Sequence, residues 1–111
     1  IESEFNTPLS VAGNHISWIF GVDTSEQALE ALKGFPLDGV VQKMRCPFLL
    51  LQGEEDLQIP MADAEALFAA SGSEDKTMRV FTVEEGGAQH TQRDHQTNGI
   101  TTIADWLAEK L

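Results

Sequence analysis

The chain has 111 residues, a formal net charge of −11 at pH 7 and a hydrophobic content of 41%, as expected for one small soluble globular domain. Its seven Lys and Arg residues stand against 18 Asp and Glu residues. This balance argues against binding to nucleic acid or to acidic membrane surfaces, because both need clustered positive charge. No apolar run approaches the roughly 20 residues that a membrane-spanning helix needs.

The cysteine content and the start of the chain indicate a cellular compartment. Cys46 is the only cysteine, so an internal disulfide is impossible and a reducing compartment is compatible with the sequence. The acidic start Ile1-Glu-Ser-Glu has none of the features of a signal peptide. We therefore expect a cytoplasmic protein. The chain also begins without Met, as expected either if residue 1 is not the native start or if the terminus has been processed.

The first part of the chain, residues 1–42, combines an apolar segment with one predicted helix. Residues 1–23 show little periodicity but carry several large apolar side chains. These are Phe5, Ile16, Trp18, Ile19 and Phe20. Such a segment is too apolar for a disordered tail, so we expect it to pack against other parts of the protein. Thr24 or Ser25 then caps a predicted helix over 26–33, which Gly34 closes.

The second part, residues 43–111, follows the order strand, helix, strand, helix. The predicted elements are strands at 48–52 and 77–83, a helix at 60–71, and a last helix capped by Thr97 or Asn98. The first strand is apolar from 48 to 51 and shows no alternation, which is typical of a strand buried on both faces of a parallel sheet. Right-handed crossovers give two parallel strands flanked by helices, as at the end of a doubly wound α/β sheet. Two strands are too few for a sheet that is stable alone in water, so this architecture calls for more chain upstream.

Two residues with acid–base chemistry stand directly after the predicted strands. Asp56 follows Gly53 at the end of the first strand, and His90 follows Gly86-Gly87 after the second. Because the carboxyl ends of neighbouring parallel strands meet at one sheet edge, the two loops should lie side by side. An aspartate that accepts from one imidazole nitrogen leaves the other nitrogen free to take a proton from a serine. We therefore expect the two side chains within about 2.6–3.2 Å of each other.

Other interpretations of these residues stay open at this point. Asp56 alone can be a turn residue that accepts from nearby backbone N–H groups, and a single loop histidine is more often a surface residue than a base. A metal site through His90, Asp94 and His95 has little support, because the two histidines lack the i, i+4 spacing that directs them at one ion. Asp94 is better explained as a hydrogen-bond partner that orders the turn before the last helix. We expect neither a metal nor a cofactor.

Around these residues the chain resembles the C-terminal third of an α/β-hydrolase. The segment CPFLLLQGEEDLQIP (46–60) resembles the strand and loop of the family's acid, and GGAQHTQRD (86–94) resembles its histidine loop. The run IADWL (103–107) resembles the closing helix. Segments WIFG (18–21) and FPLDGV (35–40) are similar to a subgroup that comprises 2,6-dihydroxypseudooxynicotine hydrolase and the fungal hydrolases that shorten polyketides in melanin-pigment pathways.

This resemblance implies an enzyme in which Asp56 is the triad acid, His90 the triad base and a serine the nucleophile. In the family the serine lies earlier in the chain, on a Gly-x-Ser-x-Gly elbow. No serine of these 111 residues has glycines two positions before and after it. We therefore expect the nucleophile and the oxyanion hole in an N-terminal remainder of the same protein, and we expect this chain alone to be inactive. The implied substrate is a small carbonyl compound: an ester, or an aryl ketone or polyketide cleaved at the carbon–carbon bond next to its ketone.

The rival hypothesis is a non-catalytic binding or interaction module that keeps the hydrolase shape. Loss of the Gly-x-Ser-x-Gly elbow upstream would favour this hypothesis.

The resemblance divides the chain into residues 1–42, the end of a cap or linker region with one helix, and residues 43–111, the C-terminal part of the hydrolase core. One edge of the two-stranded sheet should stay open. Its backbone donors and apolar neighbours predict association with the rest of the protein or with a second copy, as a homodimer.

Overall fold

A computed structural model describes residues 11–111 of the chain, so Phe5 lies outside the described residues. The chain forms two compact units that divide between Leu37 and Asp38. The resemblance places a boundary after residue 42 instead. Residues 41–43 form the 3₁₀ turn η1 (Val41–Lys43), and the carbonyl oxygen of Val41 accepts from the N–H of Gly72 at 3.1 Å. This turn therefore belongs with the second unit.

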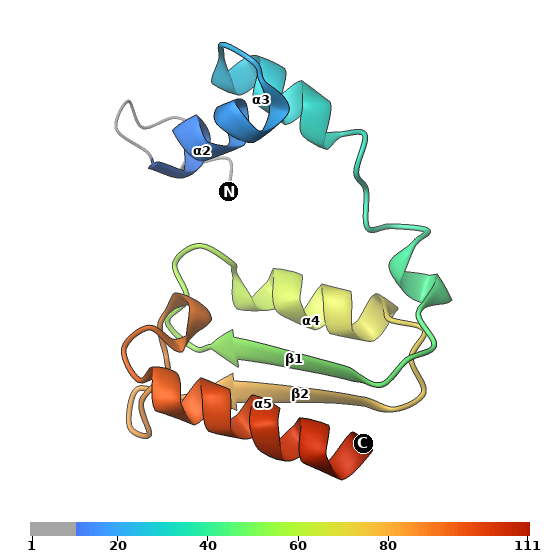
Figure 1. Cartoon of the computed structure of the whole chain (residues 1–111), viewed down its shortest axis with the longest axis vertical. Coiled ribbons are helices and arrows are strands. Elements are labelled where there is room, and N and C mark those ends of the chain that lie inside the picture. The colour runs from blue at the N-terminus through green and yellow to red at the C-terminus, as the bar shows by residue number, and fades with distance from the viewer. Residues whose placement is uncertain (1–10) are drawn as a thin grey trace. The chain divides into compact units, whose positions relative to one another are not determined.

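The first unit contains two helices, α2 (Val11–Phe20) and α3 (Ser25–Leu32) (Figure 1). Thr24 caps α3 as predicted: its hydroxyl accepts from the N–H of Gln27, while the Gln27 side chain accepts from the N–H of Thr24. This reciprocal pair is a capping box. Helix α2 was not predicted, because apolar residues at 16, 18, 19 and 20 surround a helix instead of forming one stripe.

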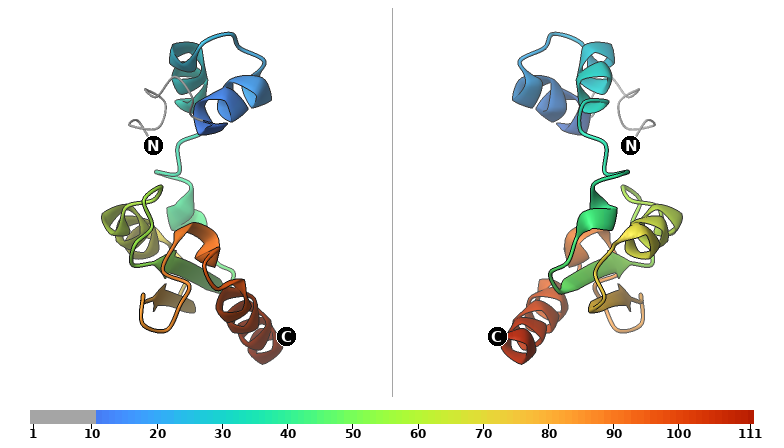
Figure 2. Two further views of the ribbon diagram at one scale, coloured as in Figure 1. Left: turned by 90° about the vertical axis from the view of Figure 1, so that its left-hand side faces the viewer. Right: turned by 90° about the vertical axis from the view of Figure 1, so that its right-hand side faces the viewer.

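The second unit is an α/β fold with a two-stranded parallel sheet. Strands β1 (Phe48–Gly53) and β2 (Lys76–Phe81) pair in register from Phe48 opposite Lys76 to Gly53 opposite Phe81. Helix α4 (Met61–Ala70) connects the strands, and helix α5 (Gln96–Lys110) follows β2. The two helices lie on opposite sides of the sheet (Figure 2). The predicted order of strand, helix, strand, helix and the parallel pairing are therefore confirmed.

Two predicted boundaries are wrong, and local hydrogen bonds explain both. Strand β2 ends at Phe81 because Thr82 begins a turn, in which its carbonyl oxygen accepts from the N–H of Gly86 at 3.0 Å. Helix α5 begins at Gln96 with His95 as its N-cap residue, not Thr97 or Asn98. The Asn98 side chain instead donates to the carbonyl oxygens of Glu85 and Gly86. It therefore ties α5 to the loop after β2.

The core of the second unit is small and lies around the two strands. Its buried apolar residues are Val41, Leu50, Ala64, Phe81 and Ala88. The prediction that β1 is buried on both faces holds only in part, since Phe48, Leu49 and Leu51 are half-buried. The reason is that β1 has β2 on one edge and no strand from residues 11–111 on the other.

Helix α5 carries an apolar stripe that the described residues leave uncovered. Its members Ile100, Ile103, Leu107 and Leu111 are all exposed. The face that turns toward the sheet instead contains Gly99, which is buried, and the half-buried Trp106. Among the described residues, no helix is long and apolar enough to cross a membrane.

Candidate active site

Asp56 lies in a tight turn directly after β1, with its side chain 5% exposed. Its N–H donates to the carbonyl oxygen of Gly53 at 3.2 Å. Its Oδ1 accepts from the backbone N–H groups of Gln58 at 2.8 Å and Ile59 at 2.9 Å. The turn thus both buries the carboxylate and fixes its orientation, as the turn interpretation of Asp56 expected.

The charge state of Asp56 follows from two opposing effects. Burial favours the neutral acid and would by itself raise the pKa of the carboxyl group. Hydrogen bonds from the Ile59 N–H, from His90 and from the Gln58 N–H outweigh burial, so the pKa of Asp56 lies below its ordinary value of 3.8. Asp56 is therefore a carboxylate at neutral pH and can only accept hydrogen bonds.

His90 opens the 3₁₀ turn η2 (His90–Gln92) in the loop between β2 and α5. Its Nδ1 lies 2.9 Å from Oδ2 and 3.2 Å from Oδ1 of Asp56. The structure thus brings the two predicted site residues together across 34 positions of sequence. Because the carboxylate cannot donate, Nδ1 must carry the proton, and in the neutral ring Nε2 is the basic nitrogen.

The two loops meet because their backbones touch. The N–H of Glu55 donates to the carbonyl oxygen of Ala88 at 3.0 Å. That oxygen occupies the space in which a side chain at Gly53 would have to lie. Gly53 therefore allows the loop after β2 to lie against the end of β1, where His90 reaches Asp56.

Asp94 binds the backbone of the same loop, as its interpretation as a turn-ordering residue predicted. Its Oδ2 accepts from the N–H groups of Gly87 at 2.8 Å and Ala88 at 3.0 Å, and its Oδ1 accepts from Gln89 at 3.0 Å. Desolvation by itself raises the pKa of the Asp94 carboxyl group. The hydrogen bonds from these N–H groups lower the pKa by more, so it lies below its ordinary value of 3.8. Residues 11–111 contain no group of three or more His, Cys, Asp or Glu side chains placed to hold a metal ion.

The backbone after His90 is strained. Thr91 has φ 56° and Gln92 has φ 54°, and this left-handed region is unfavourable for a β-branched residue such as Thr91. Each left-handed residue lowers the stability of the folded chain by about 1–2 kcal/mol relative to the same residue in a right-handed conformation. The Gln92 side chain is buried against Gly87 and Gly99. Strain of this kind persists only where the surrounding contacts hold it, and such sites are often functional.

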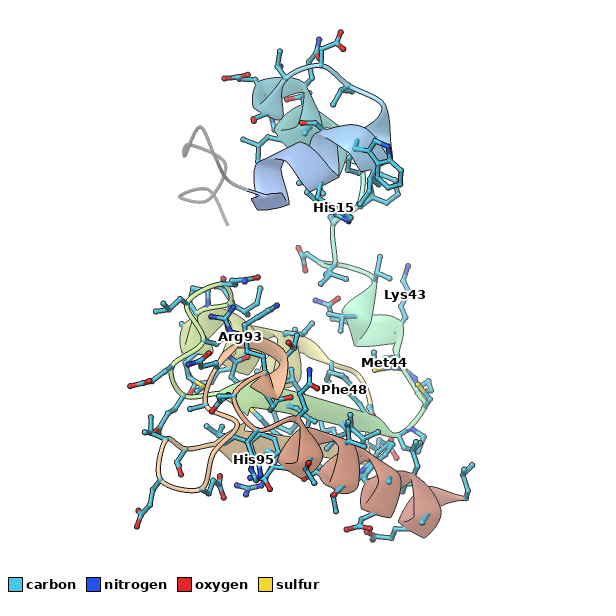
Figure 3. All side chains as sticks on the ribbon, turned by 60° about the vertical axis from the view of Figure 1, so that its left-hand side comes forward. His15, Lys43, Met44, Phe48, Arg93 and His95 are labelled. Atoms are coloured by element: carbon cyan, nitrogen blue, oxygen red, sulfur yellow. The ribbon has the colours of Figure 1, made fainter. Side chains whose placement is uncertain are left out.

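His90 lies at the wall of a surface hollow of about 370 Å³. The other lining residues are Glu55, Leu57, Gln58, Gln89 and Arg93. Arg93 donates from Nε to the Gln89 side chain at 2.8 Å, and Figure 3 shows Arg93 and His95 on different sides of the turn. No sequence pattern marks these lining residues. Their only signal is proximity in sequence to Asp56 and His90.

Comparison of the chain with models of protein families, with curated proteins and with solved structures found no match. The site is therefore defined by its own geometry. It consists of a buried carboxylate and a half-exposed imidazole in hydrogen-bond contact, at the carboxyl edge of a parallel sheet and beside a hollow. Ligands and catalytic groups of open α/β sheets gather at this edge.

Proposed function

We propose that the chain is the C-terminal part of a serine-type α/β-hydrolase in which Asp56 and His90 are the acid and base of the triad. The observation that carries this proposal is the 2.9 Å contact between Nδ1 of His90 and Oδ2 of Asp56. In this role Nε2 of His90 takes the serine proton as the serine attacks a carbonyl carbon, and later returns it to the leaving group. Asp56 holds the ring in this tautomer and stabilises the imidazolium.

The serine would come from a segment outside these 111 residues, and the open edge of β1 supports this. The N–H groups of Phe48 and Glu54 donate to residues on the β2 side, at 2.9 Å each. In a parallel ladder alternate residues point to opposite edges, so Leu49 and Leu51 direct their N–H groups to the free edge. A further parallel strand paired there would bring its carboxyl end close to Asp56 and His90. A nucleophile that follows a parallel strand on this side of the sheet would stand at the same carboxyl edge as His90.

The proposed substrate is a small ester, or a ketone that is cleaved at the adjacent carbon–carbon bond. Attack by serine on a ketone forms a tetrahedral alkoxide, which collapses by breaking the carbon–carbon bond. The electron pair leaves on a carbon next to an aromatic ring or a second carbonyl, which delocalises it, and His90 gives this carbon its proton. Water then hydrolyses the acyl-serine with His90 as general base. An ester follows the same steps with an alkoxide as the leaving group.

Turnover of aryl esters and aryl β-diketones by the protein that contains the upstream segment tests this proposal. His90→Ala should lower kcat by several orders of magnitude, whereas the matched control His95→Ala, in the same loop, should retain activity within about tenfold. Near-normal turnover by His90→Ala would show that His90 is not the base. Failure of every ester and ketone with the unsubstituted protein would favour the binding module instead.

A further inference from the structure

We propose that Asp94 is a positioning residue for His90: its carboxylate closes the loop into a clasp that holds the imidazole against Asp56. We define the histidine clasp as Gly87, Ala88, Gln89 and Asp94. His90 directly follows Gln89 and precedes Asp94, so it lies inside the loop that these hydrogen bonds close. Asp94 touches neither Asp56 nor the His90 ring in the hydrogen bonds of the described residues, so it acts through the backbone.

The first support is the convergence of donors on one side chain. Three consecutive N–H groups, those of Gly87, Ala88 and Gln89, donate to the two oxygens of Asp94 at 2.8–3.0 Å. Bonds to a charged acceptor are stronger than bonds between neutral groups. Because these three residues immediately precede His90, fixing their peptide planes fixes the point from which the imidazole extends.

The second support is that one residue connects the clasp to the loop of Asp56. The N–H of Ala88 donates to Asp94 at 3.0 Å, and its carbonyl oxygen accepts from the N–H of Glu55 at 3.0 Å. Glu55 is the residue directly before Asp56. Asp94 and the Asp56 turn therefore hold the same peptide segment from its two sides, and this arrangement sets the separation of the carboxylate and the imidazole.

The third support is the strained backbone that the clasp encloses. Thr91 and Gln92, between His90 and Asp94, both have positive φ. Two consecutive left-handed residues that are not glycine persist only under constraint from both ends. Asp94 supplies one constraint, and the buried Gln92 side chain between Gly87 and Gly99 supplies the other. Without Asp94, residues 91 and 92 can relax to ordinary φ values and turn the imidazole away from Asp56.

The catalytic consequence of the clasp rests on the proposed function, but its test needs no substrate. The readout is the tautomer of the neutral His90 ring in the complete chain, from ¹⁵N NMR. In the unsubstituted chain, the Nδ1–H tautomer should dominate because Asp56 accepts from Nδ1. Asp94→Ala should give a mixture of both tautomers, and the amides of Gly87, Ala88 and Gln89 should exchange about ten- to a hundredfold faster.

Two further variants separate positioning from general loss of structure. Asp94→Asn keeps one acceptor oxygen and should give an intermediate tautomer ratio, while the amides of β1 keep their protection. The matched control is Asp105→Asn, which removes the same charge from the exposed surface of α5 and should change nothing. If Asp94→Ala unfolds the chain, the proposal is tested by comparing the His90 tautomer ratio of Asp94→Asn with that of Asp105→Asn.

Three results would overturn the proposal. They are rapid exchange of the Gly87, Ala88 and Gln89 amides in the unsubstituted chain, a dominant Nδ1–H tautomer in a folded Asp94→Ala chain, and identical behaviour of Asp94→Asn and Asp105→Asn. An inactive full-length protein with the expected tautomers would refute the proposed hydrolase function and leave the clasp intact.

Discussion

Gly53 and Ala88 are in direct backbone contact, so that a Cβ at position 53 would collide with the carbonyl group of Ala88. This contact joins the end of β1 to the loop after β2, and the adjacent hydrogen bond from Glu55 N–H to Ala88 O measures 3.0 Å. The meeting of Asp56 and His90 therefore depends on a position that has no side chain.

Gly53→Ala should separate the two loops. We expect a loss of about 1–3 kcal/mol in the free energy of unfolding, as for other overpacked sites, together with loss of the dominant Nδ1–H tautomer of His90. Denaturant unfolding at one fixed protein concentration and ¹⁵N NMR measure the two effects. The matched control is Gly34→Ala, where the nearest atom to a new Cβ is the Ala31 carbonyl oxygen at 3.3 Å. An unfolding midpoint and tautomer equal to those of the unsubstituted chain would contradict the contact.

Thr91→Asn should stabilise the chain by about 1 kcal/mol, because asparagine tolerates the left-handed conformation that threonine resists. The measurement is again the free energy of unfolding. Thr101→Asn, on the exposed surface of α5, makes the same chemical change at an ordinary helical position and should be neutral or slightly destabilising. A destabilised Thr91→Asn chain alongside an unaffected control would contradict this prediction and would mean that the hydrogen bond from the Thr91 hydroxyl to the His90 carbonyl oxygen, at 2.6 Å, outweighs the relief of strain.

Much of the second unit could be predicted because the apolar runs and turn residues along the sequence agree with the parallel sheet into which they fold. An unbroken apolar run at 48–51 indicates a strand in a parallel sheet, and the turn residues that follow it separate that strand from the next helix. The parallel arrangement then places the ends of β1 and β2 at one edge. Asp56 and His90 could therefore be paired from sequence position alone.

The remaining features depend on contacts that sequence patterns do not encode. Helix α2 has apolar residues on all sides, so no periodicity marks it. The need for glycine at position 53 arises from Ala88, which is 35 positions away and recognisable as a neighbour only in the folded chain. The positive φ of Thr91 runs against its local preference, and contacts of Gln92 and Asp94 impose it.

The pH dependence of stability should report on Asp56. Its pKa in the folded chain lies below the ordinary value of 3.8, so its contribution is complete above that value and is lost as the pH falls toward the lower folded-state pKa. Acid unfolding of Asp56→Asn should therefore show a shallower decline below about pH 4 than the unsubstituted chain. Asp94 shifts in the same direction and remains in both proteins. Equal slopes would show that Asp56 has no depressed pKa.

The uncovered stripe of α5 and the free edge of β1 should make the isolated chain associate. Sedimentation should show dimers or larger species, since Ile100 is 64% exposed and Leu107 43% exposed and exposed apolar surface promotes association. Leu107→Lys should weaken association, whereas Thr101→Lys, with the same charge change on the same helix, should not. A monodisperse monomer with strongly protected amides at 48–52 would show instead that the chain is a self-sufficient domain.

The central claim is that Asp56 and His90 activate a serine supplied from outside these 111 residues. Labelling of the natural protein with a fluorophosphonate tests it most directly, because an activated serine oxygen attacks phosphorus and displaces fluoride while the base takes its proton. We expect one labelled serine, located outside the sequence described here, with labelling abolished by His90→Ala and strongly slowed by Asp56→Asn. Labelling that is absent from the natural protein, or undiminished in His90→Ala, would contradict the account.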